Sequence, residues 1–219
     1  MIELHFHLTP EQEDMYETYF RPGAERDFIM IPHRHKGEPW GVLLQHRAQL
    51  MYETVKASYI PVAWADIDVC FVRPCANRLL ELLEDYDLVS QGDGMGGMCF
   101  GIVVFRPTEI TEAFLYKVAH DQEAYDRNLL CDQEASNKFS YMVKWKELPR
   151  DEFYSACFAL NGGARPGWRP TTKDIPPDIR MFHANCVYHP EKMDVLKAFT
   201  EEAWPPLKDY PKPRPWGLH

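Results

Sequence analysis

Short apolar runs alternate with segments of helical spacing along this chain of 219 residues. Residues 2–8 alternate apolar and polar side chains, which predicts a half-buried strand. Residues 40–58 carry apolar side chains at helical spacing, whereas 59–66 and 98–105 are almost continuously apolar and predict buried strands. This alternation of strands and helices favours an α/β layer fold with a mostly parallel sheet.

Turn and cap residues place the remaining elements. Thr9 and Pro10 predict a helix start, and the helix is expected to run to about Phe20, where Pro22-Gly23 ends it. Further helices are predicted at 77–86, 109–119 with Thr108 as cap, 132–139 and 190–203. Further strands are predicted at 28–31, 87–90, 142–145 and 179–184. Polar loops are predicted at 32–39 and 91–97, and an irregular segment at 149–177.

Composition limits the kind of protein. The net charge is −9, with no basic run, which argues against nucleic acid as the main partner. No apolar run approaches the ~18 residues of a membrane span, and the N-terminus lacks a signal-peptide pattern. We therefore expect a cytoplasmic protein, or a soluble domain of a larger one. One domain is predicted over 1–203, followed by an extended, proline-rich tail at 204–219.

Several residues with metal-binding side chains are predicted to be structural. The six cysteines form no CxxC pair, so we expect reduced, mostly buried thiols. The histidine pairs His5/His7 and His33/His35 are also expected to be structural.

The apolar run after residue 59 ends in Asp66-x-Asp68. Burying an unpaired carboxylate is costly, so two carboxylates at the end of a strand indicate a site at the sheet edge. Ligands of α/β proteins bind at that edge. Because hard divalent cations take oxygen ligands, Asp66 and Asp68 could hold a metal that in turn binds a diphosphate.

Four further features follow in a definite order around this pair. Arg47 lies on the preceding helix, and the loop 93–97 leads into the strand 98–105, which ends in Arg-Pro-Thr. Asp132-Gln133 opens a helix, and the run Phe182-His183-Ala184-Asn185-Cys186 precedes Lys192. Over roughly residues 40–200 this order resembles the nucleotide-diphospho-sugar transferase family of GT-A-fold glycosyltransferases. The resemblance implies a Rossmann-like GT-A fold, with a mostly parallel central sheet flanked by helices.

The resemblance also implies a function and a role for each residue. It implies a metal-dependent glycosyltransferase, of the hexosyl- or pentosyl-transferase class, that moves a sugar from a nucleotide-sugar to a hydroxyl of a saccharide or glycoconjugate. A UDP-sugar is the first expected donor and a GDP-sugar the next, and Asp132-Gln133 slightly favours retention of anomeric configuration. The implied ligands of Mn²⁺ or Mg²⁺ are Asp66, Asp68 and His183; the implied donor-binding residues are Arg47, Asp66, Asp93 and Lys192; the implied catalytic residues are Asp132 and Gln133.

The sequence departs from the family pattern at two places. Cys99-Phe100-Gly101 stands where many relatives carry Asn-x-Gly, and no glycine lies between His183 and Lys192.

A reaction that inverts the anomeric configuration would need a carboxylate base, for which Asp151 and Glu152 are candidates. Trp168 is a candidate for stacking on an acceptor sugar.

The sequence is also compatible with two other functions. A phosphatase or phosphotransferase of the haloacid-dehalogenase type also has a strand ending in Asp-x-Asp. Cys70-Phe71 fits that class poorly, and the later Asp-Asp pair that would hold its Mg²⁺ is missing. The other alternative is a nucleotide-sugar-binding domain without catalytic activity.

Overall fold

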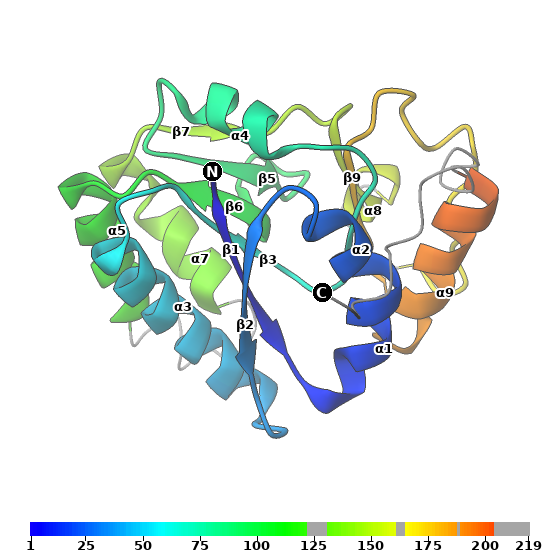
Figure 1. The fold of residues 1–219 in the computed structure, drawn as a ribbon, viewed down its shortest axis with the longest axis horizontal. Coiled ribbons are helices and arrows are strands. Elements are labelled where there is room, and N and C mark those ends of the chain that lie inside the picture. Colours follow the sequence, from blue (N-terminus) through cyan, green and yellow to red (C-terminus); the bar gives the residue numbers. More distant parts are fainter. Residues whose placement is uncertain (122–130, 161–164, 188, 204–219) are drawn as a thin grey trace, which may run out of the picture.

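A central sheet with helices on both faces forms the body of the molecule (Figure 1). The computed structural model describes residues 1–121, 131–160, 165–187 and 189–203, so the predicted tail at 204–219 lies outside the described residues. None of the helices in these ranges is long and apolar enough to cross a membrane.

Six strands make up the central sheet, in the order β2-β1-β3-β6-β5-β7. β6 runs antiparallel to its neighbours β3 and β5, whereas the other neighbouring pairs are parallel. The predicted mostly parallel α/β sheet is therefore confirmed. The strands span Glu3–Leu8 (β1), Ile29–Arg34 (β2), Val62–Ala65 (β3), Leu88–Gly92 (β5), Met98–Phe105 (β6) and Trp145–Glu147 (β7).

Both faces of the central strands are buried, which explains their continuous apolar runs. On β3, Trp64 belongs to the core under one helical layer, and its neighbours Ala63 and Ala65 belong to the other. The first layer contains α3 (Trp40–Ala57), α5 (Glu109–Ala119) and α7 (Cys131–Lys138). The second contains α4 (Ala76–Leu83), α9 (Lys192–Ala198) with a π-helical turn at Phe199–Ala203, and the N-terminal helical segment.

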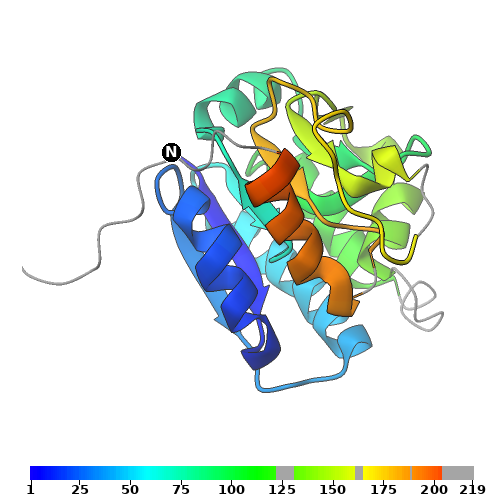
Figure 2. The ribbon, with the colours of Figure 1, turned by 90° about the vertical axis from the view of Figure 1, so that its right-hand side faces the viewer.

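The N-terminal helical segment is longer than predicted. It consists of Pro10–Gln12 (3-10), α1 (Glu13–Met15), a π-helical turn at Tyr16–Phe20 and α2 (Arg21–Ala24). The expected stop at Pro22-Gly23 is wrong, because Pro22 lies in the first turn of α2, directly after the π-helical turn, and the helical segment continues to Ala24. Gly23 instead allows close packing, since a Cβ there would lie 2.1 Å from the Phe71 carbonyl oxygen. Figures 1 and 2 both show α9 beside this segment.

A second, three-stranded sheet was not predicted. It has the order β4-β9-β8, with β4 (Val69–Phe71) antiparallel and β8 (Phe153–Ser155) parallel to β9 (Met181–His183). β8 and the following α8 (Ala156–Ala159) lie in the segment predicted to be irregular. Because His183 pairs with Val69, this sheet places His183 beside the end of β3.

Other boundaries differ locally. β3 begins at Val62 rather than Tyr59, whose side chain is fully in solvent. The predicted strand at 142–145 is instead a 3-10 turn at Ser140–Met142, followed by β7. The predictions for β6 and α5 are confirmed, and Thr108 Oγ1 caps α5 by accepting from the Thr111 N–H at 3.2 Å.

Three of the four histidines of the N-terminal pairs pack against Trp64, and His35 packs against His7. The rings of His5 and His33 stack on Trp64 with centroid distances of 5.3 and 5.0 Å. His5 Nδ1 lies 3.0 Å from His33 Nε2, and His7 Nδ1 contacts His35 Nε2. Burial, aided by neighbouring positive groups, lowers the pKa of His5 to about 4 and that of His7 to about 2. Burial also lowers the pKa of His33 and His35.

This histidine cluster predicts a loss of stability in mild acid. The unfolded chain takes up protons near pH 6.5 but the folded histidines do not, so the unfolded state binds more protons below that pH. We expect urea titrations to show a free energy of unfolding about 2–3 kcal/mol lower at pH 5 than at pH 7. The loss should shrink in a His5→Gln/His7→Gln variant. Equal stability of the wild type at the two pH values would contradict the effect.

Candidate functional site

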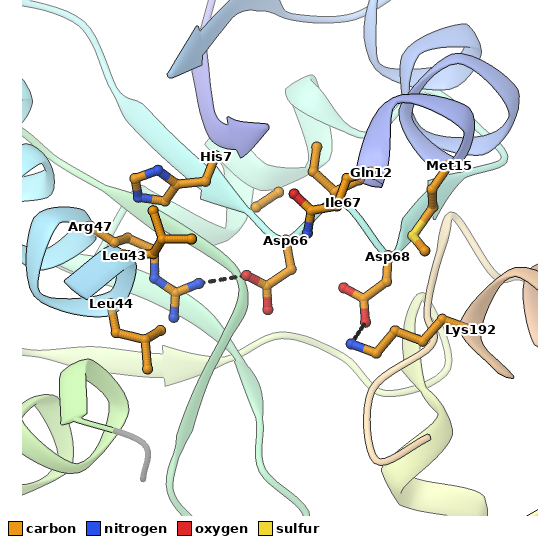
Figure 3. Close-up of a pocket in the computed structure, with 11 residues that line it drawn as sticks. His7, Gln12, Met15, Leu43, Leu44, Arg47, Asp66, Ile67, Asp68 and Lys192 are labelled. Carbon is orange, nitrogen blue, oxygen red and sulfur yellow. Dashed lines mark hydrogen bonds and ion pairs between the residues drawn. The ribbon is translucent and has the colours of Figure 1, made fainter. Parts of the chain in front are cut away.

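The carboxyl end of β3 meets α3, the N-terminal helical segment and α9 around one cavity (Figure 3). Asp66 and Asp68 lie in the turn after β3, which the Asp66 N–H ties to the Gly101 carbonyl of β6 at 3.0 Å. Arg47 reaches the cavity from α3, and Lys192 reaches it from the first turn of α9 (Figure 3). The cavity is lined by His7, Gln12, Met15, Leu43, Leu44, Arg47, Ala65, Asp66, Ile67, Asp68 and Lys192.

Two carboxylates and one imidazole converge at the edge of this cavity. His183 Nε2 lies 3.4 Å from Asp68 Oδ1 and 3.8 Å from Asp66 Oδ2. One ligand atom from each residue falls within 4.8 Å of the others, and within the described ranges this is the one such group of three. Two oxygens and a nitrogen at this spacing suit Mn²⁺, which accepts an imidazole more readily than Ca²⁺ or Mg²⁺ does. The residues therefore fit the metal site that the sequence predicted.

Charges of opposite sign hold this group together. Lys192 Nζ lies 2.6 Å from Asp68 Oδ2, which leaves Asp68 Oδ1 directed toward His183. Burial alone would raise the pKa of Asp68, but Lys192 and His183 together hold it far below its usual value. Burial likewise opposes a charged His183, yet Asp68 outweighs it and raises the pKa of His183 to about 10. A metal at this place must therefore displace a proton from the imidazole.

A second charged group lies on the α3 side. The Arg47 guanidinium joins two acids, with Nη1 2.5 Å from Asp66 Oδ1 and Nε 2.5 Å from Asp132 Oδ2. Asp132 is 1% exposed, and its Oδ1 accepts from the Gln133 N–H at 2.9 Å at the start of α7. Burial raises the pKa of Asp132, although the charge of Arg47 offsets part of the effect. Arg47 thus connects Asp132 to Asp66 and so to the group of Asp66, Asp68 and His183.

Some candidate residues are engaged elsewhere. Asp93 uses Oδ1 to close its own loop, accepting from the N–H groups of Met95 at 2.7 Å and Gly97 at 2.9 Å. Gln133 follows Asp132 on α7 and is half-buried. Neither arrangement tests the donor role of Asp93 or the catalytic role of Gln133, which stay predictions.

The structure bears on one of the two candidate bases, Glu152, whereas Asp151 stays a prediction. The Glu152 carboxylate is bound by Arg78 at 2.8 Å and by Arg180 at 2.7 Å, so it is not a free base. Trp168 is half-buried and packs against the core, and its role toward an acceptor sugar stays a prediction.

Sequence reasoning missed most of the cavity wall. Its apolar side chains come from two helices and the Asp66–Asp68 turn, and nothing distinguishes them from core residues: Met15, Leu43, Leu44 and Ile67. The position of Gln12 could have been predicted, because Thr9-x-x-Gln12 is a capping box that places Gln12 in the first turn of the N-terminal helical segment. Gln12 Oε1 accepts from the Thr9 N–H at 3.1 Å, so its amide N–H groups remain as donors.

Gly101 makes room for the imidazole of His183. A Cβ at this position on β6 would lie 2.0 Å from His183 Cε1 and 2.9 Å from Gln91 Oε1. We expect Gly101→Ala to displace the imidazole and weaken Mn²⁺ binding at least about tenfold, which electron paramagnetic resonance titration measures. Ile102→Val on the same strand is the control. Unchanged affinity in Gly101→Ala would mean that the ring does not need this space.

Comparison with known proteins identifies the fold. No protein-family model and no curated protein matches the chain. Among solved structures it is similar to a glycosyltransferase involved in glycosylation of the major capsid of PBCV-1, with a TM-score of 0.60 and 8% identity over 90% of this chain and 98% of that one. The galactosyltransferase LgtC gives a TM-score of 0.52 and 10% identity, covering 90% of this chain and 96% of its own.

A third similar structure comes from an animal. Mouse xyloside xylosyltransferase 1 gives a TM-score of 0.53 and 8% identity, covering 85% of this chain and 98% of its own. At such low identities these similarities establish the fold alone. The chain therefore has the GT-A fold of glycosyltransferases, as the sequence resemblance implied.

Proposed function

We propose that this chain is a metal-dependent glycosyltransferase that moves a sugar from a nucleotide-diphospho-sugar to a hydroxyl group of a saccharide or glycoconjugate. The observation that carries the proposal is the convergence of Asp66, Asp68 and His183 at the cavity edge of a GT-A fold. In this proposal these three residues hold Mn²⁺ or Mg²⁺. When bound, the cation would neutralise charge on the donor diphosphate.

Lys192 is the residue that we assign to the leaving group. Breaking the glycosyl–phosphate bond places negative charge on the departing diphosphate, and a fixed cation aimed at that charge lowers the barrier. Lys192 lines the cavity beside the metal group, and Asp68 holds its ammonium in place at 2.6 Å. Burial disfavours the charged lysine, but Asp68 more than compensates and raises its pKa. The lysine therefore stays cationic at neutral pH.

The α3 side of the cavity is assigned to the donor sugar. Arg47 fixes both Asp66, which lines the cavity, and the buried Asp132, which does not, and we assign the two carboxylates to hydroxyls of the donor sugar. Gln133, next to Asp132 at the start of α7, is assigned a place near the anomeric carbon, and Asp93 a hydroxyl contact. Because of this arrangement we still slightly favour a reaction that retains the anomeric configuration of the sugar.

The nucleoside is assigned to the remaining cavity wall. Met15, Leu43 and Ile67 offer apolar surface to a base or ribose, and Gln12 offers a side-chain N–H donor. A UDP-sugar remains the first donor to test and a GDP-sugar the second. The galactosyltransferase and the xylosyltransferase of similar fold keep both hexosyl and pentosyl transfer in the proposal.

The rival functions are separable by experiment. A phosphatase or phosphotransferase function of the haloacid-dehalogenase type is not favoured, because the similar solved structures are glycosyltransferases. Hydrolysis of an aryl phosphate would revive it. A non-catalytic binding domain would bind donor with metal but would release no nucleotide diphosphate.

The direct test of function is turnover of the donor. We expect wild-type protein with Mn²⁺ to release UDP, or GDP, from one nucleotide-sugar of a panel, slowly to water and faster with saccharide acceptors. Chelation of the metal should stop the release, and Lys192→Met should slow it at least about 100-fold. Absence of release from every donor under all these conditions would contradict catalysis.

A further inference from the structure

Gln91 lies where β5 is irregular, next to the metal-binding histidine. The pairing of β5 with β6 shifts register between Ser90 and Gln91, as in a β-bulge, and bulges redirect side chains near functional sites. The Gln91 side chain is 1% exposed and lies between β6, β8 and β9. It is not a cavity-lining residue, so any role in the site acts through another residue.

Both ends of the Gln91 amide are hydrogen-bonded. Its Nε2 donates to the Phe153 carbonyl oxygen at 3.1 Å, which requires the amide nitrogen on that side. Its Oε1 therefore faces His183 and lies 2.6 Å from Nδ1. Because a carboxamide oxygen only accepts, His183 Nδ1 must carry a hydrogen.

This hydrogen bond decides which nitrogen of the neutral imidazole can bind a metal. A neutral ring has one N–H, so a hydrogen on Nδ1 leaves the lone pair on Nε2. Nε2 is the atom that faces Asp68 Oδ1 at 3.4 Å and Asp66 Oδ2 at 3.8 Å. Those carboxylates alone would favour the opposite tautomer, with the hydrogen on Nε2 pointing at them. Gln91 opposes that preference from the other side of the ring.

We infer that Gln91 is a positioning residue that orients His183 and fixes its Nδ1–H tautomer, so that Nε2 is available to a divalent cation. The inference rests on the metal site of the proposed function. Hydrogen-bond partners of this kind tune metal affinity when they hold a ligating histidine. Gly101 completes the arrangement, because its missing Cβ leaves space for both the imidazole and the Gln91 amide.

Ser90 provides a matched control on the same strand. Its hydroxyl is fully buried, and no hydrogen-bond partner for it is found among the described residues. Ser90→Ala therefore changes a buried polar group next to Gln91 without touching His183. A purely structural role of this strand would make the two positions behave alike.

The test measures Mn²⁺ affinity by electron paramagnetic resonance in four proteins. We expect Gln91→Met, which keeps the volume but removes the acceptor, to weaken binding by about 10–100-fold. In Gln91→Glu the carboxyl group can accept from His183 Nδ1 whether or not it is protonated, so the Mn²⁺ affinity should stay within about threefold of the wild-type value. Ser90→Ala should also match wild type. Equal affinity of Gln91→Met and wild type would overturn the inference while leaving the metal site intact.

A second measurement needs no variant. In wild-type protein loaded with diamagnetic Zn²⁺, two-bond ¹H–¹⁵N correlation spectra report which nitrogen of His183 carries the hydrogen. We expect a protonated Nδ1 and a metal-bound Nε2, and the reverse pattern would overturn the inference. If wild-type protein binds no divalent cation at all, the metal site of the proposed function fails, and the Gln91 inference fails with it.

Discussion

Replacing Asp68 with asparagine is expected to abolish Mn²⁺-dependent donor binding and to lower the free energy of unfolding by about 2–4 kcal/mol. Asp68 is 5% exposed and is the common partner of Lys192 and the protonated His183. Asparagine keeps the shape but removes the charge, which takes the carboxylate partner from Lys192 and leaves His183 with the more distant Asp66, 3.8 Å away. Calorimetric titration of donor with Mn²⁺ and urea unfolding without metal measure the two effects.

A double variant separates the two effects of Asp68. Adding Lys192→Met to Asp68→Asn removes the lysine that has lost its carboxylate partner, so most of the stability should return. Metal binding should not return, because the carboxylate ligand is still missing. Metal-dependent donor binding in the stable double variant would show that Asp68 is not a ligand.

Arg47→Met is expected to produce the other large loss, about 3–5 kcal/mol of stability at pH 7, with donor turnover lowered about 100-fold or more. The substitution leaves Asp132, which is 1% exposed, and Asp66 without their shared cation. Burial already raises the pKa of Asp132, and loss of Arg47 raises it further. Above about pH 4, Asp132 of the folded variant then keeps a proton that the unfolded chain has lost, so the contribution of this one group to stability falls as pH rises.

The sign of this pH dependence is the test for Arg47. Urea titrations should show that the loss relative to wild type is smaller at pH 5 than at pH 7.5. Arg47→Met/Asp132→Asn removes the buried acid as well and should recover part of the stability at both pH values. An equal loss at the two pH values would mean that Asp132 does not depend on Arg47 for its charge.

The fold was largely predictable because its strands are buried on both faces. Continuous apolar runs and an N-cap threonine located β6 and α5 to the residue. Of the three-stranded sheet, β9 was predicted as a strand at 179–184, whereas β4 and β8 and the pairing of the three strands were missed, because these strands are three residues each and come from distant segments. Such short runs carry no periodicity, and only the tertiary pairing makes them strands. The end of α2 was misjudged for a related reason, since Gly23 serves packing against Phe71 rather than chain termination.

The polar part of the candidate site was predictable, whereas its surroundings were not. Carboxylates that end a buried strand are costly without a partner, so Asp66 and Asp68 were visible in the sequence. The structure brings Arg47, His183 and Lys192 to them, as the order of motifs implied. The cavity wall resembles any apolar core in sequence. The role of Gln91 could not be predicted from the sequence, because it depends on a hydrogen bond to His183, which lies 92 positions away in the chain.

The central claim is that Asp66, Asp68 and His183 hold a divalent cation on which a nucleotide-sugar binds. The most direct measurement is a thermal-shift panel of UDP-, GDP-, CMP- and dTDP-sugars, each with and without Mn²⁺. A ligand that binds only the folded state raises the melting temperature by mass action. The account predicts a rise with one nucleotide family that requires Mn²⁺ and disappears in His183→Ala. No rise with any donor, or a rise that persists without metal and in His183→Ala, would contradict it.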